Sequence, residues 1–513
     1  MEPSNALKIM FSTWLLVWSS APWAQSGPPR QVGEVAFANS GAASAQAEFL
    51  RGLAQLHNFE YEDAAAHFRE AQKIDPGFAM AYWGEAMTKN HGIWHEQDRG
   101  AALEVLSRLG ATPAAREAKA ATEREKLYLG AIDTLYGDGS KEDRDQTYVA
   151  AMARLYQRYP ADVDAAAFYA LAILSSAEQG RDFATYMRAA AVLEEVFPLH
   201  PHHPGVVHYL IHSYDDPIHA PLGLRPARIY AQIAPDAGHA QHMTSHIFLA
   251  LGMWDEVVKS NETATAVVNH HRELGGRPPG FCGHYNEWLE YAYLQLDRIP
   301  DARRVLEGCR RQAERQAADL ATRSNAKGHW DTESIDSYAV MRAHFLISSE
   351  LWQDEVAHWS LPDGAFPLAR FAFDYTDTLA AYKNSQFGRA RQGLARVEAD
   401  AKLANAWLDQ STEGDPGKRS NIAIMVDQLR ALLSTAAPDA RAALIALQAL
   451  ATREGALPLE FGPPPIIKPT EELLGELYLQ SRQPAEARKA FAADLARAPG
   501  RRLGVQNLAR ALP

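Results

Sequence analysis

The histidines in the middle of the chain are the residues best able to do chemistry. The chain has 19 histidines, and two pairs, His208 with His212 and His242 with His246, are each spaced four residues apart. On a helix this spacing places both imidazoles on one face, where they can bind the same metal ion. The HExxH zinc signature uses the same spacing, but Tyr-Leu-Ile and Met-Thr-Ser separate the histidines here. The catalytic glutamate of that signature is therefore missing.

Two predicted helices, near residues 204–214 and 239–251, carry these pairs. One further helix, near 225–234, separates them along the sequence. In a stack of helix pairs, such alternate helices line the same concave surface, and packed neighbours lie about 8–10 Å apart. We therefore expect the two histidine helices side by side along one groove.

The two pairs are expected at matching heights in this groove. His208 and His242 lie about four residues into their helices, and His212 and His246 about eight. The sequence thus predicts four imidazoles that face one another and hold one transition-metal ion or two. The alternative is that they are hydrogen-bonding residues of the groove wall and bind no metal.

Three more residues could extend this site. His239 precedes the second pair, His284 opens the next expected inner helix, and Asp215 follows the first pair, where its carboxylate could fix the tautomer of an imidazole by accepting a hydrogen bond from its N–H. Asp216 is better explained by helix termination before a proline. Imidazole ligands suit Zn, Cu, Fe or Ni, and the sequence does not select among them. His91 is expected to be a turn residue, far along the array from the site.

An internal repeat near the N-terminus predicts the helices themselves. Gly52, Ala64 and Ala71 place small residues where two paired helices touch, Phe68 fills the gap between the helices, and Pro76 ends the second one. These spacings are those of a 34-residue helix–turn–helix unit.

The same pattern returns near the C-terminus. It comprises Leu474, Gly475, Tyr478, Ala487, Phe491 and Pro499. Together the two matches resemble the tetratricopeptide repeat (TPR), clearly near 45–112 and 468–501 and in degenerate form between them. The resemblance implies an all-α fold, a TPR-like α-solenoid of stacked antiparallel helix pairs.

The central part also resembles a group of exported bacterial TPR proteins. The similar segments are HPGVVHYLIHSYDDP at 203–217 and HAQHMTSHIF at 239–248. This resemblance implies a fold and a compartment and transfers no activity.

Apolar spacing, with Pro and Gly as punctuation, predicts the remaining elements. First-of-pair helices are expected near 79–90, 163–175, 204–214, 239–251, 284–296 and 335–349, and second-of-pair helices near 62–74, 185–196, 225–234, 254–271 and 301–316. We divide the chain into a signal peptide (1–24), a flexible lead-in (25–45) and the solenoid (46–513), with a stiff connector at 458–469 before the last repeat.

The first residues indicate export. Lys8 precedes an apolar stretch over Ile9–Trp18, and small residues follow up to Ala24, after which we expect cleavage. The alternative is an uncleaved N-terminal anchor. No later segment has the roughly 18 unbroken apolar residues that a membrane helix needs, so a periplasmic or secreted protein without an integral span in the mature chain is expected.

The composition excludes several functional classes. A formal net charge of -12 gives no basic field for nucleic acid. The chain has no P-loop, no dinucleotide-binding glycine fingerprint, no G-x-S-x-G elbow and no C-x-x-C motif. With 47% hydrophobic and 22% charged residues it has enough apolar side chains for a large packed interior.

The two cysteines, Cys282 and Cys309, could form one disulfide in an oxidising compartment. They flank one predicted helical hairpin with its turn at 297–299. If both lay on the paired helices, they would be offset by about five residues, or about 7.5 Å of helical rise. This is more than a disulfide allows, so the sequence leaves the bridge open.

Three functions remain open after the sequence. The first is an exported binding protein whose histidine-lined concave groove holds a transition metal and an unidentified small-molecule, peptide or protein ligand. The second is a periplasmic metalloenzyme, an oxidoreductase or hydrolase, that uses the same histidines. The third is a metal-free protein–protein interaction scaffold. Whether the protein is an enzyme is not decided by the sequence.

Overall fold

A computed structural model describes residues 30–177, 180–322, 333–410, 416–433 and 440–512. The predicted signal peptide lies outside the described residues, as do residues 25–29 of the lead-in. Residues 31–513 form one compact unit, and all that follows concerns this unit.

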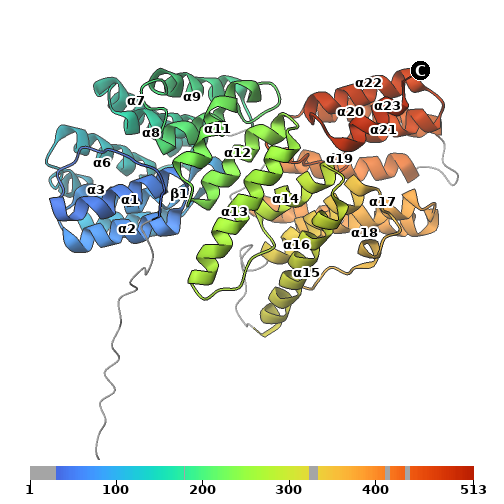
Figure 1. The fold of residues 1–513 in the computed structure, drawn as a ribbon, viewed down its shortest axis with the longest axis horizontal. Helices are drawn as coiled ribbons and strands as arrows, with labels where there is room; N and C mark the ends of the chain where they lie inside the picture. Colours follow the sequence, from blue (N-terminus) through green and yellow to red (C-terminus); the bar gives the residue numbers. More distant parts are fainter. Residues whose placement is uncertain (1–29, 178–179, 323–332, 411–415, 434–439, 513) are drawn as a thin grey trace, which may run out of the picture. The chain divides into compact units, whose positions relative to one another are not determined.

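The unit is a TPR-like α-solenoid, as the sequence predicts (Figure 1). Its helices are α1 (Gln46–His57), α2 (Tyr61–Ile74), α3 (Ala79–Met87), α4 (Arg99–Leu109), α5 (Pro113–Glu117), α6 (Glu123–Leu135), α7 (Lys141–Arg158), α8 (Val163–Ser175), α9 (Phe183–Val196), α10 (Pro204–Tyr214), α11 (Ala220–Ile233), α12 (Gly238–Ala250), α13 (Trp254–Leu274), α14 (His284–Gln295), α15 (Ile299–Thr322), α16 (Glu333–Ser349), α17 (Pro367–Lys383), α18 (Phe387–Gln410), α19 (Pro416–Leu433), α20 (Ala440–Gly455), α21 (Thr470–Gln480), α22 (Pro484–Arg497) and α23 (Arg502–Arg510). Most consecutive helices pack against each other, and α10 also contacts both α8 and α12.

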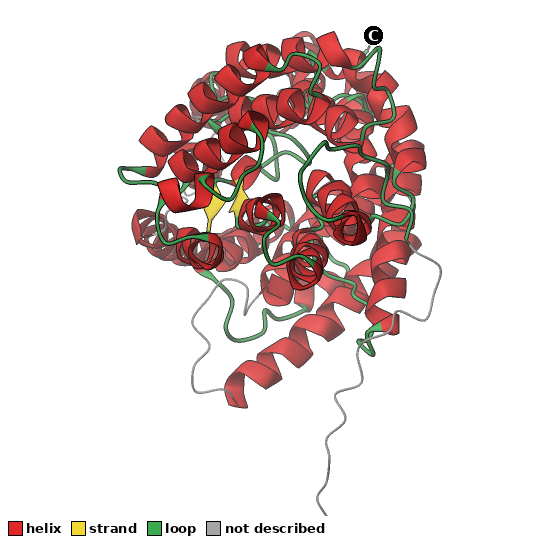
Figure 2. Ribbon diagram, turned by 90° about the vertical axis from the view of Figure 1, so that its left-hand side faces the viewer, coloured by secondary structure: helices red, strands yellow, loops and turns green. Residues whose placement is uncertain are grey.

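Strands are almost absent from the described residues. The single two-stranded ribbon pairs β1 (Asn90–His91) with β2 (Glu96–Gln97) in antiparallel register around the short 3-10 helix η2 (Gly92–Trp94). It is drawn in yellow in Figure 2 and follows the inner helix α3.

The repeat signature works through close contacts between small and aromatic residues. A Cβ on Gly84 would lie 2.4 Å from the ring of Phe68, and one on Gly52 would lie 3.1 Å from it. In the last repeat a Cβ on Gly475 would lie 2.5 Å from the ring of Phe491. These distances leave no room for a side chain, so glycine lets the paired helices approach.

The lead-in is not flexible from residue 31 onward, which corrects the prediction for that part. Val32 and Phe37 are buried, and the Phe37 ring stacks on Trp83 at a centroid distance of 5.8 Å. Asn58 donates a hydrogen bond to the carbonyl of Val32 (2.7 Å). Buried apolar side chains and hydrogen bonds such as that from the Ser40 N–H to Glu125 (2.7 Å) hold the segment against the repeats.

The first helical hairpin contacts the middle of the array. α1 packs against α10, which lies about 150 residues further along the chain. The Tyr230 hydroxyl on α11 donates to Asn58 Oδ1 (2.8 Å), and the backbone N–H of His239 donates to Glu60 (3.2 Å). The turn between α1 and α2 therefore lies directly over the histidine helices.

Candidate metal centre

Two helices and the start of a third position six histidines. His208 and His212 lie on α10, His239, His242 and His246 lie on α12, and His284 is the first residue of α14. The helix α10 begins sharply because Pro204 occupies its first turn and the His203 side chain accepts a hydrogen bond from the Val206 N–H. α10 packs directly against α12, as expected for alternate helices of the stack.

The six histidines form two triads. The first triad is His208, His212 and His239, and the second triad is His242, His246 and His284. Within each triad one ligand nitrogen from every ring lies within 4.8 Å of the others.

The two triads are neighbours. The ring centroids of His212 and His246 are 5.8 Å apart, and those of His239 and His242 are 6.3 Å apart. The arrangement is thus one continuous cluster of imidazoles.

In the second triad the Nε2 atoms of His242 and His246 face each other. His242 Nδ1 lies 2.6 Å from the Asn261 side-chain oxygen, and His246 Nδ1 lies 2.5 Å from Asp215 Oδ2. Both partners accept hydrogen bonds, so both Nδ1 atoms carry a proton. If both rings are neutral, their Nε2 atoms point their lone pairs at each other across 3.1 Å.

A positive centre between these nitrogens relieves the repulsion. One solution is a proton, which would make one ring an imidazolium, but burial and the neighbouring His284 and His246 hold the pKa of His242 well below its usual range. The other is a metal ion, since two nitrogens bound at about 2.0–2.1 Å with tetrahedral geometry lie about 3.3 Å apart. A proton can be shared by two rings only, whereas a third ring, His284, also converges on this point. Three converging rings favour a metal ion.

In the first triad two Nε2 atoms also face each other, but their hydrogen-bond partners do not fix both protons. His208 Nδ1 donates to the backbone carbonyl of His57 (2.6 Å), so its Nε2 carries a lone pair, 3.2 Å from His239 Nε2. His239 Nδ1 lies 3.3 Å from the Tyr285 hydroxyl. If the Tyr285 hydroxyl donates to His239 Nδ1, the proton of a neutral His239 ring lies on Nε2. His239 Nε2 can then donate to His208 Nε2, and these two nitrogens need no metal ion.

The third member of the first triad is less well satisfied. His212 Nε2 is buried and has no hydrogen-bond partner. Burial and the adjacent His246 lower the pKa of His212 well below its usual range. A neutral, buried and unpaired imidazole nitrogen is the kind of atom that a metal ion binds.

A third group, His57, Asp164 and His203, is better explained as a hydrogen-bonding network. His57 Nε2 lies 3.0 Å from Asp164 Oδ1, and His203 Nε2 lies 3.4 Å from the same oxygen. His203 Nδ1 accepts the N–H of Val206, so Nε2 carries the proton and has no lone pair for a metal. The network holds the end of α1, whose His57 carbonyl orients His208.

The triads are buried, which corrects the expectation of an open groove. Of the six histidines only His284 is exposed to solvent. The Phe59 ring, in the turn after α1, covers the first triad at a centroid distance of 4.4 Å from His208. Phe59 has a φ of 58°, in the left-handed region that bulky residues rarely occupy. Side chains from repeats far apart in the sequence thus close the groove.

The second triad is covered in the same way. The Trp288 ring lies 4.4 Å from His246, and the Phe461 ring, from the connector before the last repeat, lies 5.3 Å from it.

Trp94, beside the β1–β2 ribbon, reaches within 6.1 Å of His239. His91 stacks on Tyr61 at 4.0 Å and is not a member of either triad.

The predicted levels of the pairs are partly wrong. His212 faces His246 as expected, but the partner of His208 is His239 and not His242. Two crossing helices have residues at equal height only near the crossing point. Counting residues from each helix start therefore pairs His212 with His246 correctly, but it misses the partner of His208 by one helical turn.

Asp215 and Asp216 have separate roles. Asp215 accepts the His246 Nδ1–H, as the sequence suggested for a supporting carboxylate. Asp216 accepts from Arg181 (2.9 Å) and contacts His219 (2.9 Å).

Sequence reasoning missed Asn261, Phe59 and Phe461. Asn261 is fully buried in α13, and its amide donates to the Val257 carbonyl (3.0 Å), which turns its oxygen toward His242. A buried asparagine inside an amphipathic helix was the one available signal. Phe59 and Phe461 reach the site only through tertiary packing.

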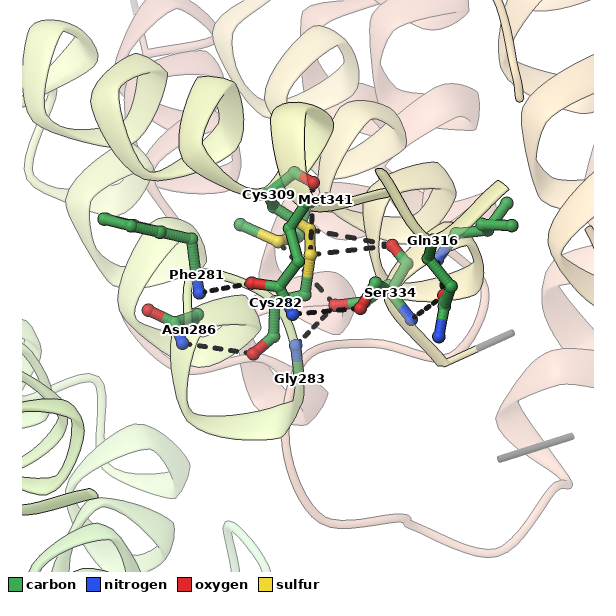
Figure 3. The surroundings of a disulfide bond; sticks show 11 residues. Phe281, Cys282, Gly283, Asn286, Cys309, Gln316, Ser334 and Met341 are labelled. Carbon is green, nitrogen blue, oxygen red and sulfur yellow. Dashed lines mark hydrogen bonds between the residues drawn. A yellow bond between two sulfur atoms is a disulfide. The ribbon is translucent and has the colours of Figure 1, made fainter. Parts of the chain in front are cut away.

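A disulfide joins Cys282 and Cys309, with a Cα separation of 4.7 Å (Figure 3). The offset expected from helical rise does not apply, because Cys282 precedes α14 and lies on an extended segment that returns to α15. The Gly283 N–H donates to Ser337 Oγ on α16 (2.7 Å). The bridge thus fixes the chain two residues before His284.

Comparison with known proteins adds nothing to the fold and the site described above. No protein-family model matches the sequence, and no characterised protein matches it in sequence. Among solved structures, the Cut9–Hcn1 hetero-tetramer of the APC/C aligns with a TM-score of 0.34 and 15% identity over 93% of this chain and 78% of that chain. Yeast Tom70 gives 0.32 and 11% over 91% and 95%. The human IFIT1 dimer with m7Gppp-AAAA gives 0.30 and 15% over 86% and 94%. At such scores the likeness carries no argument about this chain. No described helix is both long and apolar enough to cross a lipid bilayer.

Proposed function

We propose that the protein is a metalloprotein whose two histidine triads hold a pair of transition-metal ions inside a TPR-like solenoid. The observation that carries the proposal is the pair of lone pairs on His242 and His246, 3.1 Å apart in a buried site where both Nδ1 protons are already committed. A metal ion is the partner that these two nitrogens and the third ring, His284, lack.

The donor set indicates the class of metal. Six imidazoles without a thiolate ligand suit Zn, Cu, Fe or Ni and do not suit Mg or Ca. Three protein ligands per ion leave at least one coordination position free, the pattern of metal sites that bind a further ligand.

Export remains part of the proposal. The N-terminal segment has the pattern of a signal peptide, and the Cys282–Cys309 bridge suits an oxidising compartment. A periplasmic or secreted location would also expose the apoprotein to metal ions outside the cytosol.

Two uses of the centre are compatible with the geometry. Burial of five of the six histidines favours an ion that is held and not exchanged. Exposure of His284 favours the enzyme alternative, because it marks a route from solvent to the second triad. A metal-free interaction scaffold is the function that remains if no metal binds.

Metal content of matched variants tests the proposal. The mature protein should carry close to two transition-metal ions per chain by elemental analysis after purification without chelators. His242→Ala with His246→Ala should remove one ion or both. His344→Ala is the matched control, since His344 is also a buried histidine and lies outside all three groups. Equal metal content in the control and the double variant would refute the site.

A further inference from the structure

The third member of the second triad is held in place differently from the other two. His242 and His246 lie within α12, and each ring donates from Nδ1 to a buried acceptor. His284 is the first residue of α14, and no residue that the structure describes hydrogen-bonds to its ring, which contacts the His242 ring at a centroid distance of 4.5 Å. The position of this ring therefore depends on where the backbone enters α14.

The local sequence gives the start of α14 little support. Its N-cap is Gly283, which has a φ of 91° and no side chain to accept the first N–H groups of the helix. Residues 275–283, which connect α13 to α14, include four glycines and two prolines and form no helix or strand. Because glycine restricts the backbone least of all residues, this segment does not fix His284 by itself.

Tertiary links supply the anchor that the local sequence lacks (Figure 3). The disulfide joins Cys282 to Cys309, a fully buried residue of α15. The Gly283 N–H donates to Ser337 Oγ on α16 (2.7 Å), and the Asn286 side chain donates to the Cys282 carbonyl (3.2 Å). The bridge is the covalent member of this set and ties the helix start to α15.

We propose that the Cys282–Cys309 bridge is a redox switch for the second metal ion. While the bridge is closed, His284 is held where its ring nitrogen converges with those of His242 and His246. When the bridge is reduced, the backbone before α14 is released and the third ligand loses its fixed position. The first triad has no residue in this segment and keeps its ion. The switch rests on the proposed metal centre.

The reductant is a dithiol, and burial selects the sulfur that it attacks. Cys309 is fully buried, whereas Cys282 is partly exposed. One thiolate of the dithiol forms a mixed disulfide with Cys282, and Cys309 leaves as a thiolate and takes up a proton. The second thiol then displaces Cys282, which also leaves as a thiol. Two electrons and two protons thus pass to the bridge, and the dithiol becomes a disulfide.

The rest of α14 does not depend on the bridge. The helix packs against α13, α15 and α16, and its residues Trp288, Tyr291 and Leu294 are buried. Only the first turn lies next to the bridge, and exposed helix ends with few buried contacts open most easily. Reduction therefore frees the start of the helix, which carries His284, and leaves the body of the helix in place.

Metal affinity without the bridge tests the switch. The protein with Cys282→Ser and Cys309→Ser is purified without reductant, and competition titration against a chromophoric chelator measures both ions. Affinity for the second ion should fall about tenfold, the loss typical of a ligand that is no longer oriented. In a background of His242→Ala and His246→Ala, which retains only the first triad, the serine substitutions should leave the affinity unchanged.

A His284→Ala variant separates positioning of the ligand from general destabilisation. If the bridge acts through His284, opening it in the His284→Ala protein should cause no further loss of affinity, because the two changes share one mechanism. A further loss of the same size in that background would overturn the proposal. Equal affinities of the wild-type protein and the serine variant for the second ion would overturn it as well.

Hydrogen exchange of the metal-free protein provides a measurement that needs no metal. The amides of Asn286 and Glu287 donate to the Gly283 carbonyl (3.0 Å each). Opening the bridge should speed their exchange about tenfold and leave α12 unchanged. Unchanged exchange in a protein that holds both ions would overturn the switch alone. A wild-type protein that binds no metal would overturn the switch together with the metal centre, and so the two failures are distinguishable.

Discussion

The hydrogen bond from His246 to Asp215 should set the metal affinity of the second triad. Nδ1 and Oδ2 are 2.5 Å apart, and the two side chains are 2% and 1% exposed. Removing the group that orients a metal-binding histidine costs about 10–100-fold in affinity, or about 1.4–2.7 kcal/mol. Because burial excludes water as a substitute acceptor, we expect Asp215→Ala to fall near the upper value. Asp215→Asn keeps an acceptor oxygen and loses only the charge, so it should fall near tenfold.

Asp216 provides the matched control for this prediction. It is the next residue, equally buried, and its partners are Arg181 and His219 rather than a triad histidine. Breaking its buried ion pair should destabilise the fold by about 3–5 kcal/mol while metal affinity changes less than twofold. Competition titration against a chromophoric chelator measures both variants. An Asp216→Asn variant that loses as much affinity as Asp215→Asn would refute the role of Asp215.

Three further predictions concern the bridge, acid and export. Removing the Cys282–Cys309 bridge by double substitution to Ala should lower the free energy of unfolding by up to about 3.5 kcal/mol, from the 27-residue separation of the two cysteines. Calorimetry measures this loss, and no change in unfolding would mean that the bridge does not form. Because the folded pKa of His242 is depressed, the unfolded chain binds more protons as pH falls below about 6.5, and the metal-free protein should lose up to about 1.4 kcal/mol of stability per pH unit from this residue. Denaturant titrations at pH 7.5 and 5.5 test the sign, and greater stability at pH 5.5 would contradict it. Intact-mass analysis of the cell-envelope fraction should find a chain that begins at or near Gln25, and a cytosolic chain that retains Met1 would exclude export.

The helices were predictable because their signals are local. The predicted spans 163–175, 204–214 and 284–296 match α8, α10 and α14 within one residue. Apolar spacing, Pro204 and the small residues of the repeat act within a few turns of chain, and neighbouring repeats do not change them.

The closure of the site was not predictable, because distant residues produce it. Phe59 comes from the first repeat and Phe461 from the connector before the last, and each covers a different triad. Neither has a sequence signal beyond being aromatic. The role of His239 was missed in part for the same reason, since it depends on how α10 and α12 cross.

Anomalous diffraction from crystals of the metal-loaded protein tests the metal centre most directly. Two anomalous peaks should appear per chain, one among the ring nitrogens of His208, His212 and His239, and one about 2.0–2.1 Å from the ring nitrogens of His242 and His246, with His284 as the third ligand. Soaking with Zn, Cu, Fe or Ni in turn identifies the metal that gives full occupancy. A structure in which both triads stay free of metal at saturating concentrations would contradict the account.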